Sequence, residues 1–283
     1  MSVVTPSSFV SLPRPFIVGV VREPDPLNAI ATIMNSERDG AQAFTFHLSK
    51  LGSQYYNLDD LRTVMSTTSR PIMALNYRSN GNISDADRVQ LQLLAVQAGA
   101  RAVDLPADVL DPQHADWNGN TPGFLESGPP QELSTDSGVV AAQRELINEF
   151  HGRGAEVMLS SHTRTVMTAQ EVLAHARAMT TRGADAVKIV SACLNEEQMI
   201  EALRAVVLLR RELDVPFQYQ CHGQHGKLTR IIGPMIGSML VFCNQRFTAT
   251  TFPEQPLIAA MRRVFQDVDY IVPESSVDTF DRA

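Results

Sequence analysis

The 283-residue chain is poor in cysteine, has no long apolar run and carries no excess of basic residues. Its three cysteines, Cys193, Cys221 and Cys243, include no closely spaced pair, which argues against a disulfide framework and fits reduced thiols in a cytoplasmic protein. No apolar segment reaches membrane-spanning length, and the amino terminus lacks the basic and apolar regions of a signal peptide. A formal net charge of -7 and a pI near 5.5 argue against nucleic acid as a partner.

Short apolar runs alternate with longer segments in which apolar residues recur every three to four positions. This alternation predicts eight strands, at Phe16–Val21, Gln42–Ser49, Pro71–Tyr77, Ala102–Asp108, Glu156–Ser161, Ala186–Cys193, Phe217–Gly223 and Met239–Asn244. Eight strand–helix units over roughly 250 residues predict an α/β chain folded as a single-domain (β/α)8 TIM barrel. The doubly wound dinucleotide-binding alternative is weakened because no GxGxxG turn follows the first strand.

Two segments do not follow this alternation of strands and helices. Residues 1–15 are rich in Ser, Thr and Pro and are expected to form a flexible amino-terminal segment, with the barrel over 16–283. Residues 111–138 are rich in Pro, Gly, Asn, Ser and acids and contain Trp117, the only tryptophan. They predict a long loop insertion after the fourth strand, which is either a functional lid or a surface insertion without function.

A lysine inside an apolar strand is the most informative feature of the sequence. Lys188 lies in the run Ala186–Val190, and the preceding predicted strand ends in His162. Burial disfavours the charged form of an ammonium group and so favours a nucleophilic amine. An amine and an imidazole at the ends of consecutive strands are the two groups that imine chemistry on a ketone requires. The competing interpretation is a lysine that reaches solvent and a histidine that caps a helix.

With this layout, four fragments resemble the type I 3-dehydroquinate dehydratase family, Schiff-base-forming barrel enzymes of the shikimate and quinate pathways. They lie in order along a match that covers roughly residues 16 to 265. The fragments are Ser160-Ser161-His162, Gly183-Ala184-Asp185-Ala186-Val187-Lys188-Ile189, His222-Gly223-Gln224-His225-Gly226-Lys227-Leu228-Thr229-Arg230 and Thr251-Phe252-Pro253-Glu254-Gln255.

The resemblance implies a role for each matching residue. Lys188 would form the imine and His162 would act as general acid and base. Arg230, backed by Thr251 and Gln255, would hold a substrate carboxylate, since a guanidinium offers a bidentate fork. Arg78 also matches a substrate-binding arginine of the family. No cofactor is implied, because the lysine itself supplies the electron sink. The resemblance also implies a homodimer, because members of the family dimerise.

The chain departs from the family pattern on the side that reads substrate hydroxyls. Where the family has Glu-x-Arg-x-Asp in the second strand, this chain has Thr45, His47 and Ser49. The family's Asp-x-Glu in the fourth strand becomes Asp104-Leu105-Pro106, and His222 stands where a methionine is usual. A site that loses its hydroxyl partners loses discrimination by orders of magnitude. We therefore expect a lyase for a carboxylated, cyclic ketone with altered hydroxyl recognition.

Three alternatives remain open at this point. His47, His222, His225 and Cys221 are chemically suitable zinc ligands, but their spacing fits no compact motif, so no metal is expected. A non-catalytic descendant that binds a quinate-like carboxylate would explain the changes in the second strand, although it would not need Lys188. An imine-dependent C–C lyase or cyclase of specialised metabolism would use the same residues.

Overall fold

Eight parallel strands form one sheet that curls into a barrel. The computed structural model describes residues 8–78, 83–114, 124–128, 130–249 and 251–268. The strands are β1 (Phe16–Val21), β2 (Ala43–His47), β3 (Ile72–Leu75), β4 (Ala102–Pro106), β5 (Glu156–His162), β6 (Ala186–Ala192), β7 (Phe217–His222) and β8 (Leu240–Cys243). All eight predicted strands are confirmed. Six of them are shorter than predicted, and β5 extends one residue further, to His162.

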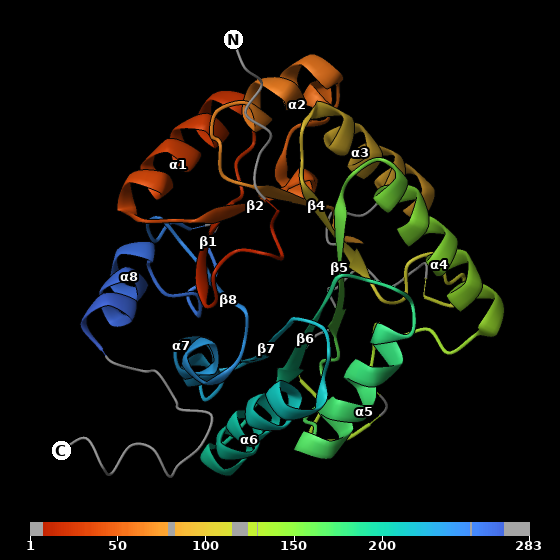
Figure 1. Ribbon diagram of the computed structural model, residues 1–283, viewed down its shortest axis with the longest axis vertical. Helices are drawn as coiled ribbons and strands as arrows, with labels where there is room; N and C mark the ends of the chain where they lie inside the picture. Colours follow the sequence, from red (N-terminus) through yellow and green to blue (C-terminus); the bar gives the residue numbers. More distant parts are fainter. Residues whose placement is uncertain (1–7, 79–82, 115–123, 129, 250, 269–283) are drawn as a thin grey trace.

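The order of strands in the sheet is β7-β6-β5-β4-β3-β2-β1-β8. The barrel closes between β7 and β8, the two strands at the ends of this order, where the Met239 N–H donates a hydrogen bond of 2.8 Å to the Phe217 carbonyl. An outer ring of helices surrounds the strands (Figure 1). Its members are α1 (Pro26–Asp39), α2 (Leu58–Met65), α3 (Asp85–Ala98), α4 (Ser137–Gly152), α5 (Ala169–Thr180), α6 (Glu196–Glu212), α7 (Lys227–Ile236) and α8 (Ile258–Asp267); two 3-10 turns, η1 (Leu48–Lys50) and η2 (Ser53–Tyr55), follow β2.

Local capping explains where the helices begin. Thr168 caps α5 through its side chain, and Glu171 accepts a hydrogen bond from the Thr168 N–H, which completes a capping box. Asp25 caps α1 just before Pro26, and Gly40 ends the helix in the left-handed conformation. These caps satisfy backbone groups that would otherwise have no partner at the helix ends.

Side chains alternate between the barrel interior and the helix layer, as the two-residue period of a strand requires. In β6, Val187 and Ile189 pack in the core between strands and helices, whereas Ala186 packs in the core inside the barrel. Lys188 has the same parity as Ala186, so its side chain points into the barrel. This parity carries every inward-facing residue near a strand's carboxyl end toward the same cavity.

The amino-terminal residues that the structure describes are packed against the barrel. Phe9 is fully buried in the interior core and meets Phe16 edge to face with ring centroids 5.5 Å apart. The Phe9 and Val10 N–H groups donate to the Glu156 carboxylate at 2.7 and 3.1 Å. The expectation of a flexible segment is therefore wrong for residues 8–15, because apolar burial and hydrogen bonds hold them in place. Residues 1–7 lie outside the described part.

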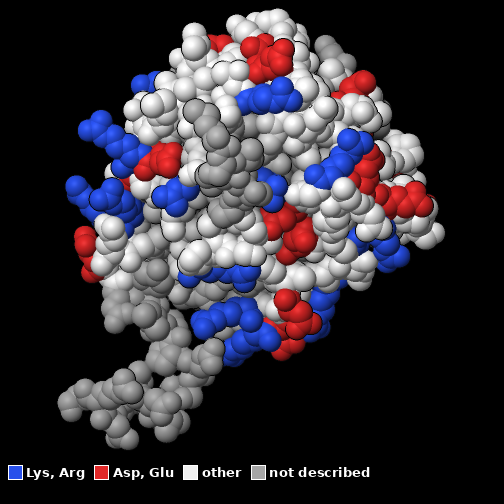
Figure 2. Space-filling model, turned by 45° about the horizontal axis from the view of Figure 1, so that its top comes forward, with Lys and Arg blue, Asp and Glu red and all other residues white. Residues whose placement is uncertain are grey.

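Within the described ranges, no helix combines the length and apolarity needed to cross a bilayer. On the face shown in Figure 2, basic side chains are interspersed with acidic ones. The predicted insertion is only partly described, since residues 115–123 and 129 lie outside the description. Its described carboxyl-terminal part runs along the barrel, where the Gln131 and Ser134 N–H groups donate to the Thr163 and Ala107 carbonyls.

Candidate active site

A cavity of about 440 Å³ opens toward the carboxyl ends of the strands. Each of the eight strands contributes at least one inward-facing residue to its wall, and the loops after β4 and β8 complete it. A cavity of this size that gathers convergent polar groups at this end of a β/α barrel is typical of an active site. The sequence-predicted residues Lys188, His162, Arg230, Gln255, Arg78, His47, Thr45 and His222 all line it.

Lys188 lies at the floor of the cavity and is 4% exposed. Its Nζ donates to the Tyr77 hydroxyl and lies 3.1 Å from Asp104 Oδ2. Tyr77 also donates to Asp104 Oδ2 at 2.8 Å, and Ser160 donates to Oδ1 at 2.5 Å. The buried amine therefore faces a carboxylate with three donors around it, an arrangement that compensates its charge and offers an acceptor for its proton.

His162 stands on the strand next to Lys188, in the register His162↔Val190. Glu132 lies behind it: Oε2 is 2.8 Å from His162 Nδ1 and accepts the His162 backbone N–H at 2.7 Å. A carboxylate at Nδ1 favours the tautomer with the proton on Nδ1, which leaves the Nε2 lone pair available as a base. The Tyr77 ring meets the imidazole edge to face at 5.0 Å and so connects it to Lys188.

The electrostatics suit proton transfer by this pair. Burial, and then the charge of Lys188, hold the pKa of His162 well below its ordinary value, so the imidazole is neutral near pH 7. Burial raises the pKa of Glu132 to about 7, even though the His162 N–H and the Lys188 charge act in the opposite direction. Glu132 also has a φ of 52°. A non-glycine residue in this left-handed region costs about 1 kcal/mol or more, so the surrounding contacts must hold it there.

Arg230 is held by a carboxylate of the protein itself. Its Nη2 donates to Glu254 Oε2 at 2.9 Å, and His222 Nδ1 lies 3.1 Å from the same oxygen. The Gly223 N–H donates to Glu254 Oε1 at 2.9 Å. Burial alone would raise the pKa of Glu254, but His222 and Arg230 hold it at about 2. The guanidinium that was predicted to hold a substrate carboxylate therefore already has an acidic partner.

The turn before α7 needs its glycines for this arrangement. Gly223 has a φ of 96°, and a Cβ there would lie 2.5 Å from the Cys193 carbonyl oxygen. This close approach directs the Gly223 N–H toward Glu254 and sets the start of the helix that carries Arg230.

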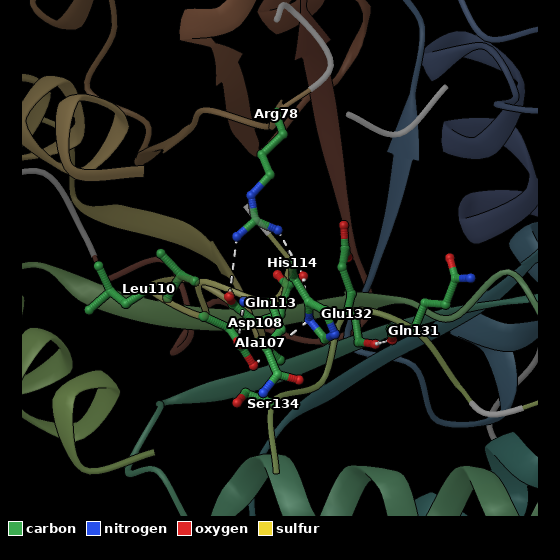
Figure 3. Close-up of polar contacts among 12 residues, drawn as sticks. Arg78, Ala107, Asp108, Leu110, Gln113, His114, Gln131, Glu132 and Ser134 are labelled. Carbon is green, nitrogen blue, oxygen red and sulfur yellow. Dashed lines mark hydrogen bonds and ion pairs between the residues drawn. The ribbon is translucent and has the colours of Figure 1, made fainter. Parts of the chain in front are cut away.

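Arg78 is buried in an ion-pair network beside the cavity. Its guanidinium reaches Asp85 Oδ2 at 2.5 Å and Asp108 Oδ2 at 2.7 Å, as Figure 3 shows for Asp108. Burial lowers the pKa of Arg78, but the two carboxylates outweigh it and raise the pKa above its ordinary value. A substrate carboxylate would have to compete with both partners, so substrate binding by Arg78 stays a prediction.

Other predicted residues divide between the cavity and its surroundings. Thr251 is absent from the described cavity wall and pairs instead with Thr248, through hydrogen bonds of 2.9 and 3.0 Å. The side chains that were considered as zinc ligands do not converge. Cys221 Sγ contacts Ser191 on the helix-facing side of the sheet, and His225 Nδ1 lies 3.5 Å from Glu196 Oε1. Among the described residues, no group of three or more metal-ligating side chains gathers.

The sequence analysis missed four residues that shape the cavity: Tyr77, Glu132, Glu254 and Arg22. Tyr77 and Arg22 share the inward parity of β3 and β1, so the strand period could have placed both. Glu254 lies inside the fragment Thr251-Phe252-Pro253-Glu254-Gln255 that the sequence analysis singled out, but no role was predicted for it. No sequence signal places Glu132, because it belongs to a long segment without periodicity.

Known proteins share this fold and parts of this sequence. The structure of 3-dehydroquinate dehydratase from Geobacillus kaustophilus HTA426 is similar to this one, with a TM-score of 0.70 and 17% sequence identity. The similarity covers 93% of this chain and 97% of that chain. The type I enzyme from Clostridium difficile, solved with covalently modified comenic acid, is similar with a TM-score of 0.69 at 16% identity, over 91% of this chain and 93% of its own.

A curated relative, 3-dehydroquinate dehydratase of Alkaliphilus oremlandii (strain OhILAs), is 29% identical over 123 residues. That match covers 43% of this chain and 48% of the relative, so it spans about half the relative's length. The family model for type I 3-dehydroquinase matches residues 20–270. Since that match takes in nearly the whole barrel and every cavity residue described above, the chain belongs to the type I 3-dehydroquinase family.

Proposed function

We propose that the protein is a cofactor-independent, Schiff-base-forming lyase that acts on a carboxylated, cyclic ketone. The observation that carries the proposal is the position of Lys188, whose buried amine faces the cavity beside Asp104 while His162 stands on the neighbouring strand. A buried amine next to a proton acceptor and an imidazole is the set of groups that imine catalysis uses.

The steps follow from the positions of these groups. Lys188 gives its proton to Asp104 and attacks the ketone carbon, and loss of water yields an iminium. The iminium acidifies the adjacent carbon, from which neutral His162 removes a proton through Nε2. The electron pair passes into the iminium and then expels a hydroxyl group that receives the proton from His162. Hydrolysis of the imine releases the unsaturated product and restores Lys188.

Glu132 supports the proton transfer without contacting the ligand's reacting atoms. An ionised carboxylate at Nδ1 stabilises the imidazolium that His162 becomes after taking a proton. The fourth strand has Pro106 where the family has a second acid, and the loop that follows supplies Glu132 instead. The segment between β4 and α4 therefore has a function in this proposal, in contrast to a surface insertion without one.

Hydroxyl recognition differs from the family pattern in the same proposal. Thr45 and His47 replace a carboxylate and a guanidinium in β2, and the buried Thr45 Oγ1 has no hydrogen-bond partner in the described structure. Burial, followed by the charges of Arg22 and Lys188, holds the pKa of His47 well below its ordinary value. On β2, neutral side chains in place of a carboxylate and a guanidinium favour a substrate whose hydroxyl pattern differs from that of 3-dehydroquinate.

Borohydride trapping tests the reaction directly. The protein is incubated with 3-dehydroquinate and with related cyclic keto-acids, reduced with borohydride, digested and analysed by mass spectrometry. We expect a reduced adduct on the peptide that contains Lys188, because reduction fixes the imine as a secondary amine. Lys227→Ala is the matched control, since this exposed lysine lies outside the cavity and the variant should give the same yield of adduct.

The outcome separates the competing functions. Tight binding of an acid without an adduct would contradict the lyase and favour a ligand-binding descendant. An adduct followed by a product with a shorter or rearranged carbon skeleton would favour C–C bond chemistry. The covalently modified comenic acid in the Clostridium difficile relative supports the use of an acid as a probe.

Two further proposals concern the cellular location and the oligomeric state of the protein. A cytoplasmic location is supported by three buried cysteines that carry no disulfide. A homodimer rests on the family resemblance alone, and light scattering coupled to size-exclusion chromatography would measure it.

A further inference from the structure

The basic side chains of the cavity are not equally available to a ligand. Arg230 is paired with Glu254, Arg78 with Asp85 and Asp108, and Lys188 with Asp104. Each of these cations is compensated by a carboxylate of the protein. An anionic ligand would gain little from them unless it displaced that carboxylate.

Arg22 differs from these cations. It follows β1 and lines the cavity, and its guanidinium carbon lies 4.4 Å above the centroid of the Phe252 ring. Among the residues that the structure describes, no carboxylate or other acceptor pairs with Arg22, and its buried Nε has no hydrogen-bond partner. Burial lowers the pKa of Arg22, so its charge is partly desolvated as well as uncompensated.

The neighbours of Arg22 do not neutralise it. The register Val20↔Thr45 and Val21↔Phe46 brings the end of β1 beside His47. The Arg22 charge contributes to lowering the pKa of both His47 and Lys50, which shows positive charge gathered at the ends of β1 and β2. A desolvated guanidinium without an anion is costly, and a bound anion would remove that cost.

We propose that Arg22, with the unpaired hydroxyl of Thr45, forms a subsite that binds a carboxylate of the ligand. The Thr45 side chain is 1% exposed, lines the cavity and leaves Oγ1 without a partner, so its hydroxyl is available to donate to the same group. The planar fork of Arg22 matches a carboxylate, and the Phe252 ring holds the guanidinium plane in place.

The position of the subsite fits the chemistry at Lys188. In the order of strands, β1 lies four strands from β5 and β2 lies four strands from β6, so the two pairs face each other across the barrel. A ligand whose carbonyl reaches Lys188 would place its carboxylate at the opposite wall. The inference rests on the proposed function for the identity of the ligand, and it reassigns the anion contact from Arg230 to Arg22.

The test compares 3-dehydroquinate with its neutral methyl ester in the full-length protein and in Arg22→Gln, Arg22→Lys and Arg230→Gln. Two quantities are measured: the concentration that gives half-maximal trapping at Lys188 and the dissociation constant by calorimetry. We expect Arg22→Gln to raise both values for the acid about tenfold to a hundredfold and to leave the ester unchanged. Arg22→Lys keeps the charge but loses the fork, so it should give an intermediate loss.

Arg230→Gln should weaken acid and ester by the same factor, because it disturbs the Glu254 contact and not the carboxylate subsite. Arg62→Gln, at a surface position on α2, controls for the loss of an arginine. Circular dichroism melting confirms that each variant is folded, and Arg22→Lys carries the test if Arg22→Gln is not.

The two proposals can fail separately. Equal half-maximal concentrations for the acid in the parent protein and in Arg22→Gln would overturn the subsite and leave the lyase standing. Arg22-dependent binding of the acid, without an adduct from 3-dehydroquinate or from any of the related keto-acids, would contradict the lyase and retain the subsite. A loss specific to the acid in Arg230→Gln, or no binding of the acid by either method, would overturn the subsite.

Discussion

The two walls of the cavity differ in how their polar groups are satisfied. On the wall formed by β4, β5 and β6, Lys188 and Ser160 both donate hydrogen bonds to Asp104, and His162 is hydrogen-bonded to Glu132. On the opposite wall, Arg22 Nε and Thr45 Oγ1 have no partner among the described residues, and neither has Gln255 Oε1. Buried polar atoms without partners are uncommon in proteins, so those on this wall point to a ligand that supplies the missing partners.

This difference separates the chemistry of the site from its ligand recognition. A network in which each member holds the next is pre-organised and does not have to rearrange during the reaction. Buried polar groups without partners instead destabilise the unliganded protein, and a ligand that supplies their partners removes this cost. Substitutions on the first wall should therefore affect the rate, and substitutions on the second should affect which ligand binds and how tightly.

The largest effect is expected for Lys188→Ala. The rate with whichever keto-acid gives the strongest adduct should fall at least about 10⁴-fold, because the electron sink is lost. Steady-state assays of product absorbance, with Lys227→Ala as the control, measure this. A rate within tenfold of the parent protein would contradict the mechanism.

His162→Ala should lower the rate about 10²- to 10⁴-fold, the range expected for general acid–base catalysis. The variant should still form the borohydride-trapped adduct, since the imine forms on Lys188. Comparing the yield of adduct with the turnover number separates the two steps. Equal losses in both quantities would show that His162 acts before the imine and not after it.

Arg78→Met tests whether this arginine has a structural role, as a partner of Asp85 and Asp108, or binds the ligand. Leaving Asp108 buried without its partner should lower the free energy of unfolding by about 3–5 kcal/mol. Urea titration measures the loss, and Arg62→Met on the surface should cost about 1 kcal/mol or less. Unchanged stability together with weaker binding of the acid would instead support the predicted substrate contact.

The pH dependence of Glu132 should produce the smallest of these effects. The pKa of about 7 lies above the ordinary carboxyl value, so ionisation of the buried group destabilises the fold: its favourable contribution is complete below about pH 4.5 and is lost as pH rises through 7. Activity should change in the opposite direction, because only ionised Glu132 stabilises the His162 imidazolium.

We expect the rate to fall about fivefold from pH 7 to pH 6 in the parent protein, because the ionised fraction of a group with a pKa of about 7 falls by that factor. In Glu132→Gln this part of the pH profile should be flat and the rate should stay low throughout. Profiles of turnover and of melting temperature, measured in the same buffers, check both signs. An unchanged acid limb in the variant would assign that limb to another group.

Much of the framework could be predicted from local patterns in the chain. Strand and helix periods placed all eight strands, and helix ends such as the cap at Thr168 depend only on residues close in sequence. The parity of β6 is also local, so the inward direction of Lys188 follows once the strand is recognised. These features need only contacts within a few residues, which the sequence displays directly.

The pairing of the charged side chains in the cavity depends on contacts between segments that are distant in the sequence. Glu132 reaches His162 across 30 positions, and Glu254 reaches Arg230 across 24, each through a loop without periodicity. Sequence by itself determined which strands form and which residues face inward, because backbone geometry repeats every two residues. Only the tertiary structure decided which of the inward-facing charges are neutralised, because that depends on how loops after different strands fold back over the same cavity.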